Sequence, residues 1–207
     1  MVSNFRNLKR IVYLISPKKI YPNFYADLTK VLTAKNVSFF QLRLKKKPKN
    51  LIIKIAKKIK IITKKFKVKL IINDSAEIAR KANADGCHIG QLDGSIKLAR
   101  IHLKNKIIGV TCHNSKELVE IASKNKANYL AFGSFFKSKL KPNAKKANLK
   151  ILAWAKKNIK KPIVAIGGIT DKNYKQLIKA GANYIAISSF IWNNPILKPE
   201  IAIRKFK

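Results

Sequence analysis

Short runs of apolar, mostly β-branched residues recur along the chain and alternate with longer stretches in which apolar residues stand three or four positions apart. The runs are typical of strands buried on both faces of a parallel sheet, and the wider spacing predicts helices with one buried face. The predicted strands are Ile11–Ile15, Ser38–Leu42, Leu70–Ile72, Cys87–Ile89, Ile107–Val110, Tyr129–Phe132, Ile163–Ile166 and Tyr184–Ile187. The clearest predicted helix runs from Leu51 to Phe66.

Eight alternations of strand and helix favour an α/β fold of the (β/α)8 TIM-barrel type. A doubly wound open sheet has the same alternation, and periodicity alone does not separate the two folds. The chain has 207 residues, which leaves a barrel little room for insertions. Because no linker, low-complexity segment or second core is visible, we expect residues 1–207 to form a single domain.

The composition is strongly basic, with 46 Lys+Arg against 9 Asp+Glu and a formal net charge of +37. Hydrophobic residues make up 47%, which excludes a disordered polybasic tail. The lysines are spread through nearly every block of ten, whereas a nucleic-acid surface would concentrate them. We therefore favour a general compositional bias and expect no specific nucleic-acid partner, with a basic nucleic-acid-binding protein as the alternative. A positive field of this kind attracts anionic substrates.

The start of the chain and its cysteines bear on location. No apolar run reaches the roughly 18 residues of a membrane helix, and Ile11–Ile15 is too short for the core of a signal peptide. Two cysteines, Cys87 and Cys112, do not make a disulfide framework. We expect a cytoplasmic protein with no membrane contact. The oligomeric state stays open, and a homodimer is one alternative.

Polar residues follow the predicted strands at the ends where the active sites of barrels form. Asp74 and Asp93 follow two neighbouring strands. Each could be a helix N-cap, which is the usual role of aspartate before a helix. Together they could also hold Mg²⁺, which binds one or two carboxylates plus substrate phosphates. Because the chain has so few acidic residues, we favour the metal interpretation.

Other strand ends carry groups suited to anions. Gln41 and Arg43 stand two apart and so face the same side of a strand, and an unpaired arginine inside a barrel would be costly without a ligand. Gly167-Gly168 follows a later strand, where it could be a tight turn or a backbone cradle for phosphate. Ser188 and Ser189 follow the last strand and add hydroxyl donors. We favour ligand binding at these positions.

The dipeptides Cys87-His88 and Cys112-His113 look like metal ligands but are poor chelates, because neighbours on a strand point to opposite faces. No cysteine or histidine spacing matches a zinc site. His113 is either a ligand contact or a structural histidine. His102, inside a helix, is expected on the surface.

Six motifs, in this order and spacing, resemble those of the thiamine phosphate synthase family, whose fold is a (β/α)8 barrel. The resemblance runs from Tyr13 to Ser189, and the motifs are specific only as a set. They read Gln41-Leu42-Arg43-Leu44-Lys45, Ile72-Asn73-Asp74, Ala84-Asp85-Gly86-Cys87-His88-Ile89-Gly90-Gln91-Leu92-Asp93, Gly109-Val110-Thr111-Cys112-His113, Ala165-Ile166-Gly167-Gly168-Ile169 and Ala180-Gly181-Ala182.

The resemblance implies that the protein joins a hydroxymethylpyrimidine diphosphate to a thiazole phosphate, giving thiamine phosphate and pyrophosphate. In the family pyrophosphate leaves first, and the thiazole nitrogen captures the resulting pyrimidine cation. The protein then needs no nucleophile and must bind the leaving charge and position the partner. Mg²⁺ is the implied cofactor, held by Asp74 and Asp93, and small phosphorylated molecules are the implied partners.

The same resemblance assigns roles to individual residues. The residues implied to bind the pyrimidine diphosphate are Gln41, Leu42, Arg43, Leu44, Lys45, Asn73, Thr111 and Lys141. Among them, the positive charges implied to assist the departure of the diphosphate are Arg43, Lys45 and Lys141. The residues implied to bind the thiazole phosphate are Ser138, Gly168, Ser188 and Ser189. Thr111 replaces the serine usual in the family and retains its hydroxyl.

Three departures from the family pattern weaken the diphosphate and thiazole-phosphate subsites most. The loop Lys137-Ser138-Lys139-Leu140-Lys141 has Leu140 where a second threonine is usual, Gly133-Ser134 replaces Gly-Pro, and Ser75 replaces an arginine. The changes leave open an alternative, a relative resembling thiazole tautomerases in which His113 would transfer protons. The intact Gln41–Lys45, Asn73-Asp74 and Gln91–Asp93 motifs favour the synthase.

Overall fold

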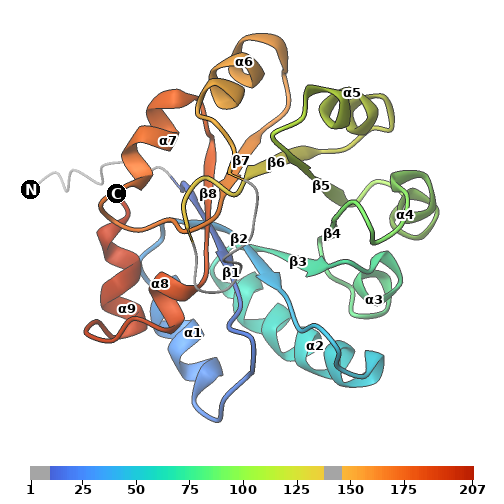
Figure 1. Ribbon diagram of the computed structural model, residues 1–207. Helices are drawn as coiled ribbons and strands as arrows, with labels where there is room; N and C mark the ends of the chain where they lie inside the picture. The colour runs from blue at the N-terminus through green and yellow to red at the C-terminus, as the bar shows by residue number, and fades with distance from the viewer. Residues whose placement is uncertain (1–9, 138–145) are drawn as a thin grey trace, which may run out of the picture.

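Eight parallel strands close into a barrel in the computed structural model, which describes residues 10–137 and 146–207 (Figure 1). Each strand pairs with the next along the chain, and the last pairs with the first. The strands are β1 Val12–Ile15, β2 Val37–Leu42, β3 Lys69–Asn73, β4 Gly86–Ile89, β5 Ile107–His113, β6 Tyr129–Gly133, β7 Ile163–Ile166 and β8 Tyr184–Ile187. Because β8 pairs with β1, the barrel is confirmed and the doubly wound sheet is excluded.

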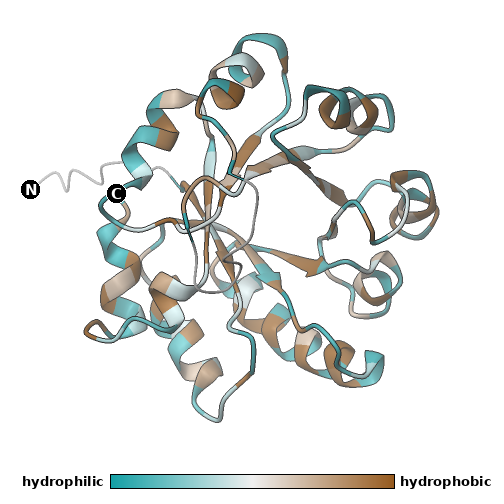
Figure 2. Ribbon diagram, in the orientation of Figure 1, coloured by the Kyte–Doolittle hydropathy of each residue, from teal (hydrophilic) through white to brown (hydrophobic). Residues whose placement is uncertain are grey.

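The helices form a ring outside the barrel, as Figure 1 shows. They are α1 Phe24–Leu32, α2 Lys49–Lys65, α3 Ala76–Lys81, α4 Ile96–Leu103, α5 Lys116–Lys124, α6 Lys150–Asn158, α7 Tyr174–Ala180, α8 Ser189–Trp192 and α9 Pro199–Ala202, followed by a 3₁₀ turn, η1 Ile203–Lys205. Their apolar faces lie against the strands, and Figure 2 shows hydrophilic residues on their outer sides. Over the described ranges, no helix has the length and apolar character needed to cross a membrane.

The predicted strands agree closely with the observed ones, and β7 and β8 have the predicted bounds. The largest difference is at β5, which continues beyond Val110 to His113. Its extension pairs with β6 through a register shift between Thr111 and His113. The predicted strand ended too early because its last residues lie at the polar rim of the barrel, where the apolar pattern stops.

Two apolar layers surround the sheet. The larger lies between strands and helices, and the smaller lies inside the barrel, where aromatic rings meet. Tyr13 stacks on Phe39 with 5.3 Å between ring centroids, and Tyr129 meets both rings edge-on or tilted. Gly109 of β5 makes room for this layer, since a Cβ at that position would overlap the ring of Tyr129. The interior is therefore a packed core and leaves the strand ends as the place for ligands.

Asp85, before β4, is an anchor at the opposite end of the barrel. Its carboxylate accepts hydrogen bonds from the Lys60 ammonium at 2.6 Å and from the Leu70 backbone N–H at 2.7 Å. We expect Asp85→Ala to lower the free energy of unfolding by about 2–3 kcal/mol, because both partners are left unpaired in a half-buried place. Urea unfolding measures this, with Lys60→Met as the milder control. A loss under about 0.5 kcal/mol, typical of surface positions, would contradict the role.

Candidate active site

Two carboxylates meet at the carboxyl-end rim of the barrel. Asp74 follows β3, and its backbone N–H donates to the His88 carbonyl of β4 at 2.7 Å. Asp93 lies in the loop after β4, where its carboxylate accepts a hydrogen bond from the Gly90 N–H at 3.0 Å. Burial and the hydrogen bond and negative charge of Asp93 raise the pKa of Asp74. The two side chains therefore share one place at the rim.

Neither aspartate is a helix cap, so the capping interpretation is wrong. The hydroxyl of Ser75 accepts from the Ile78 N–H and caps α3, and the hydroxyl of Ser95 does the same for α4. Asp74 also has a left-handed backbone with φ of +66°, a conformation that L-residues adopt with some strain. The two carboxylates are therefore not committed to capping the helices that follow them.

Cations surround this pair. Lys45 places its ammonium 3.5 Å from the carboxylate of Asp74. The charges of Lys45 and Arg43 pull the pKa of Asp74 down, against the stronger raising effects of burial and Asp93. Arg43 is half-buried, and its backbone N–H donates to the Ser16 hydroxyl at 3.0 Å. The rim thus carries both acidic oxygens and groups suited to bind phosphate.

The donor set fits a divalent cation of the Mg²⁺ kind. The two neighbouring carboxylates, with the pKa of Asp74 raised by burial and then by Asp93, are hard oxygen ligands whose repulsion a cation would relieve. In residues 10–137 and 146–207 there is no cluster of three or more acidic, histidine or cysteine side chains that could enclose a metal. The remaining ligands of such an ion would be phosphate oxygens and water, as is common for Mg²⁺.

The segment after β2 divides between the rim and the core. Gln41 faces the barrel interior and is 3% exposed, Arg43 is half-buried and Lys45 is exposed. Leu42 and Leu44 are buried in the apolar layer under the helices. These two leucines can offer a ligand only their backbone groups, although the resemblance included them in the binding segment.

A chain of buried and half-buried polar groups crosses the interior just below the rim. The Gln41 amide donates to the Tyr13 hydroxyl at 3.1 Å, which lies 2.8 Å from the Tyr129 hydroxyl. That hydroxyl is 3.0 Å from Nδ1 of His88, and Nε2 of His88 is 2.8 Å from the Thr111 hydroxyl. Gln41 and Thr111, both predicted ligand residues, are therefore linked through the core.

Sequence reasoning gave His88 no role, and the structure places it in this chain between Tyr129 and Thr111. Burial lowers the pKa of His88 to about 4, so the imidazole is neutral near pH 7. The sequence did contain a signal for His88. It lies two residues after Gly86, so both face the same side of a strand, and that strand is next to the one that ends in Asn73. The opposite faces of the Cys-His pair are confirmed, since Cys87 is fully buried among the helices and His88 points inward.

The predicted phosphate-binding residues lie after β7 and β8. Gly168 has φ of +60°, and its carbonyl accepts from the Asn173 side chain at 3.0 Å. A Cβ on Gly168 would meet Phe136 and Lys137, so this turn lies against the start of the β6 loop. The Ser188 hydroxyl donates to the Ser16 carbonyl, and Ser189 begins α8.

Two of the predicted residues, Ser138 and Lys141, lie outside the described residues. Asn73 is half-buried at the end of β3, where it pairs with His88 in the sheet. His113 is exposed at the end of β5 with φ of +51°, and His102 is exposed on α4, as expected.

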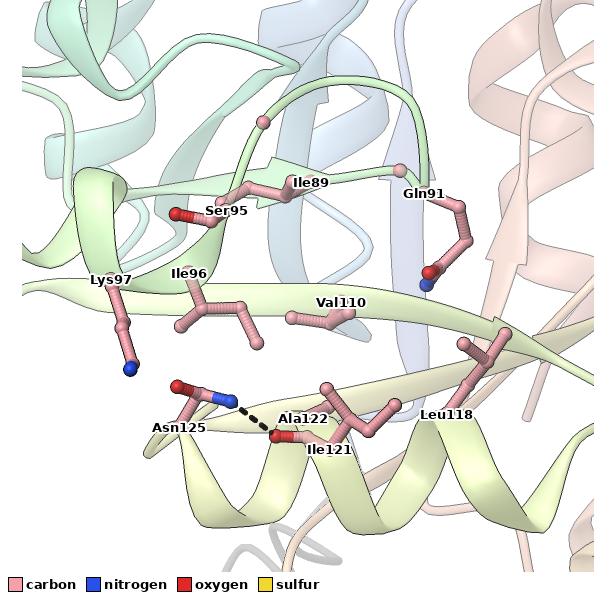
Figure 3. A pocket seen from close by; sticks show the side chains of 12 residues that line it. Ile89, Gln91, Ser95, Ile96, Lys97, Val110, Leu118, Ile121, Ala122 and Asn125 are labelled. Atoms are coloured by element: carbon pink, nitrogen blue, oxygen red, sulfur yellow. Dashed lines mark hydrogen bonds between the residues drawn. The ribbon is translucent and has the colours of Figure 1, made fainter.

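A separate cavity of about 290 Å³ lies outside the barrel, between α4 and α5 (Figure 3). Its lining is mostly apolar, with Ile96, Val110, Leu118 and Ile121 around it and only Lys97 as a cation. The dashed bond in Figure 3 joins the Asn125 side chain to the Ile121 carbonyl. Because the cavity lacks the carboxylates and cations of the rim, it does not have the chemistry of the candidate active site.

The fold and the rim together define a (β/α)8-barrel enzyme of the kind that handles phosphorylated small molecules. The thiamine monophosphate synthase family model matches residues 12–191, and the chain belongs to that family. It is 54% identical over 200 residues to the thiamine-phosphate synthase of Pelagibacter ubique (strain HTCC1062), covering 96% of this chain and 97% of that one. A second relative, the thiamine-phosphate synthase of Rhodospirillum centenum (strain ATCC 51521 / SW), is 36% identical over 94% of this chain and 95% of its own.

A solved structure agrees with these relatives. The thiamine phosphate pyrophosphorylase from Pyrococcus furiosus superposes with a TM-score of 0.85 at 27% identity, covering 96% of this chain and 94% of that one. The family expected from the motifs is thereby confirmed. The roles of individual residues remain predictions that rest on the geometry of the rim.

Proposed function

We propose that this protein is a thiamine-phosphate synthase, which joins 4-amino-5-hydroxymethyl-2-methylpyrimidine diphosphate to thiazole phosphate with release of pyrophosphate. The observation that carries the proposal is the meeting of Asp74, Asp93 and Lys45 at one rim of a barrel of this family. Acidic ligands beside cations suit a metal–diphosphate group.

The chain's own residues stabilise a departing anion. Arg43 and Lys45 lie near Asp74 and place positive charge where the diphosphate develops negative charge. Lys141, which lies outside the described residues, would add a third cation. When bound at Asp74 and Asp93, Mg²⁺ supplies Lewis-acid stabilisation of the diphosphate oxygens.

Other residues position the two reactants. Gln41, Asn73 and Thr111 orient the pyrimidine, and the buried ring layer beneath them excludes water from its inner side. The thiazole phosphate binds to Gly168, Ser188 and Ser189, together with Ser138, which lies outside the described residues. Because the amino group of the pyrimidine itself stabilises the cation formed on departure, positioning and charge are sufficient without a nucleophile.

The test is product formation from both precursors. We expect thiamine phosphate and pyrophosphate in equal amounts with Mg²⁺ present, and loss of the reaction when EDTA is added, with recovery on excess Mg²⁺. Omitting the pyrimidine diphosphate separates this activity from an isomerisation of the thiazole alone. Turnover of the thiazole compound by itself, with no thiamine phosphate formed from both, would refute the proposal.

A further inference from the structure

We propose that the buried chain Gln41–Tyr13–Tyr129–His88–Thr111 has one fixed direction of hydrogen-bond donation and thereby sets which edge of a pyrimidine the site accepts. Tyr13, Tyr129 and His88 are positioning residues in this account, since they act through Gln41 and Thr111. The ligand part of the inference rests on the proposed function, whereas the direction of the chain does not.

The direction follows from the first donor. The amide nitrogen of Gln41 can only donate, and it lies 3.1 Å from the Tyr13 oxygen. The Tyr13 proton is then directed to Tyr129, which lies 2.8 Å away. The Tyr129 proton is in turn directed to Nδ1 of His88, at 3.0 Å.

The second half of the chain continues in the same sense. A neutral imidazole has one nitrogen that donates and one that accepts a hydrogen bond. Because Nδ1 accepts the hydrogen bond from Tyr129, the N–H is on Nε2. Nε2 donates to the Thr111 oxygen at 2.8 Å. The Thr111 hydroxyl therefore has its own proton to donate to a ligand. The opposite direction requires the Gln41 amide to be turned over, with every proton in the chain reversed.

The two ends present a complementary pair to the site. With its nitrogen engaged by Tyr13, Gln41 offers its amide oxygen as an acceptor, and Thr111 offers a donor. Within the described residues, no hydrogen bond to the Gln41 oxygen is present, and the one fully buried side-chain polar atom without a partner belongs to Asn36, so the Gln41 oxygen keeps some exposure. An aminopyrimidine has amino N–H donors and ring-nitrogen acceptors that match. A 4-oxo pyrimidine exchanges donor and acceptor along that edge.

The first experiment reads the direction without any ligand. The ¹⁵N chemical shifts of the imidazole show which nitrogen carries the proton, and the chain has only two other histidines, both exposed. We expect the neutral His88 imidazole to carry its proton on Nε2 in the wild-type protein. In the Tyr129→Phe variant we expect a mixture of the two tautomers. A proton on Nδ1 in the wild-type protein would overturn the proposal.

The second experiment measures selectivity. Titration calorimetry gives the dissociation constants of the aminopyrimidine diphosphate and of its 4-oxo counterpart, with Mg²⁺ present and thiazole phosphate absent. We expect the wild type to prefer the amino compound by at least about 100-fold. Tyr129→Phe should reduce this preference by about 10-fold, because Gln41 and Thr111 are then free to reorient. Tyr184→Phe is the matched control, since Tyr184 packs in the same ring layer outside the chain.

The outcomes separate the two proposals. If Tyr129→Phe weakens the binding of both compounds equally, or leaves binding and preference unchanged, then Tyr129 only supports the fold. The inference then fails. The same holds if Tyr184→Phe lowers the preference as much. A wild type that binds neither compound, with His88 protonated on Nε2, refutes the proposed function and leaves the direction of the chain standing.

Discussion

Asp93→Asn is expected to reduce kcat by at least about 100-fold at the Mg²⁺ concentration that saturates the wild type, because the ion that stabilises the departing diphosphate then loses one of its two carboxylate ligands. The amide keeps the size of the side chain and one oxygen for the Gly90 N–H, so the loop should retain its shape. Steady-state rates over a range of Mg²⁺ concentrations measure the effect. We expect partial recovery at high Mg²⁺, since one carboxylate remains at Asp74.

The control for this variant is Glu120→Gln, which removes the same charge from the exposed face of α5. It should leave the rate and the Mg²⁺ dependence within two-fold. Thermal unfolding of both variants shows whether the barrel is intact. If Asp93→Asn folds normally and turns over at a near-wild-type rate, Asp93 is not a metal ligand and the assignment of the acidic pair falls with it.

Gly109→Ala is expected to destabilise the barrel by about 3 kcal/mol and to lower Tm by about 6–12 °C. The added methyl group would overlap the phenol ring of Tyr129, which is held between Tyr13 and Phe39 and has little room to move. Gly109 is thus required by a close approach of neighbouring strands. Calorimetry or urea unfolding measures the loss.

A double-mutant cycle identifies the cause of that loss. Tyr129→Leu removes the ring atoms that the new methyl group would meet, so Gly109→Ala should cost about 1–2 kcal/mol less in that background. Equal costs in the two backgrounds would show that the penalty comes from the strand backbone of β5. A cost below about 1 kcal/mol in the wild-type background would show that the interior adapts to the methyl group.

The sequence by itself determined the eightfold alternation of strands and helices and the neighbourhood of the site. Strands buried on both faces must be apolar throughout, which made the eight runs visible, and ligands gather where parallel strands end. The position of Asp74 and Asp93 after adjacent strands therefore predicted their meeting at the rim. Alternation along a strand likewise predicted that Gln41 faces inward, and its side chain is 3% exposed in the barrel interior.

Closure of the barrel was decided only by the tertiary structure, because the pairing of β8 with β1 joins residues at opposite ends of the chain. The tertiary structure also decided that neither Asp74 nor Asp93 caps a helix. Ser75 and Ser95 cap the helices instead, one or two residues further on, and the sequence offers either side chain as a cap. The difference depends on loop geometry, which local propensity does not specify.

The buried chain from Gln41 to Thr111 is the clearest case of what the fold alone decided. Its members come from five different strands, and each residue by itself is an ordinary inward position. A hydrogen bond depends on distances of a few tenths of an ångström between atoms that the sequence separates by up to 116 positions. Sequence patterns record which face a side chain occupies, whereas only the closed barrel sets which side chains meet across it.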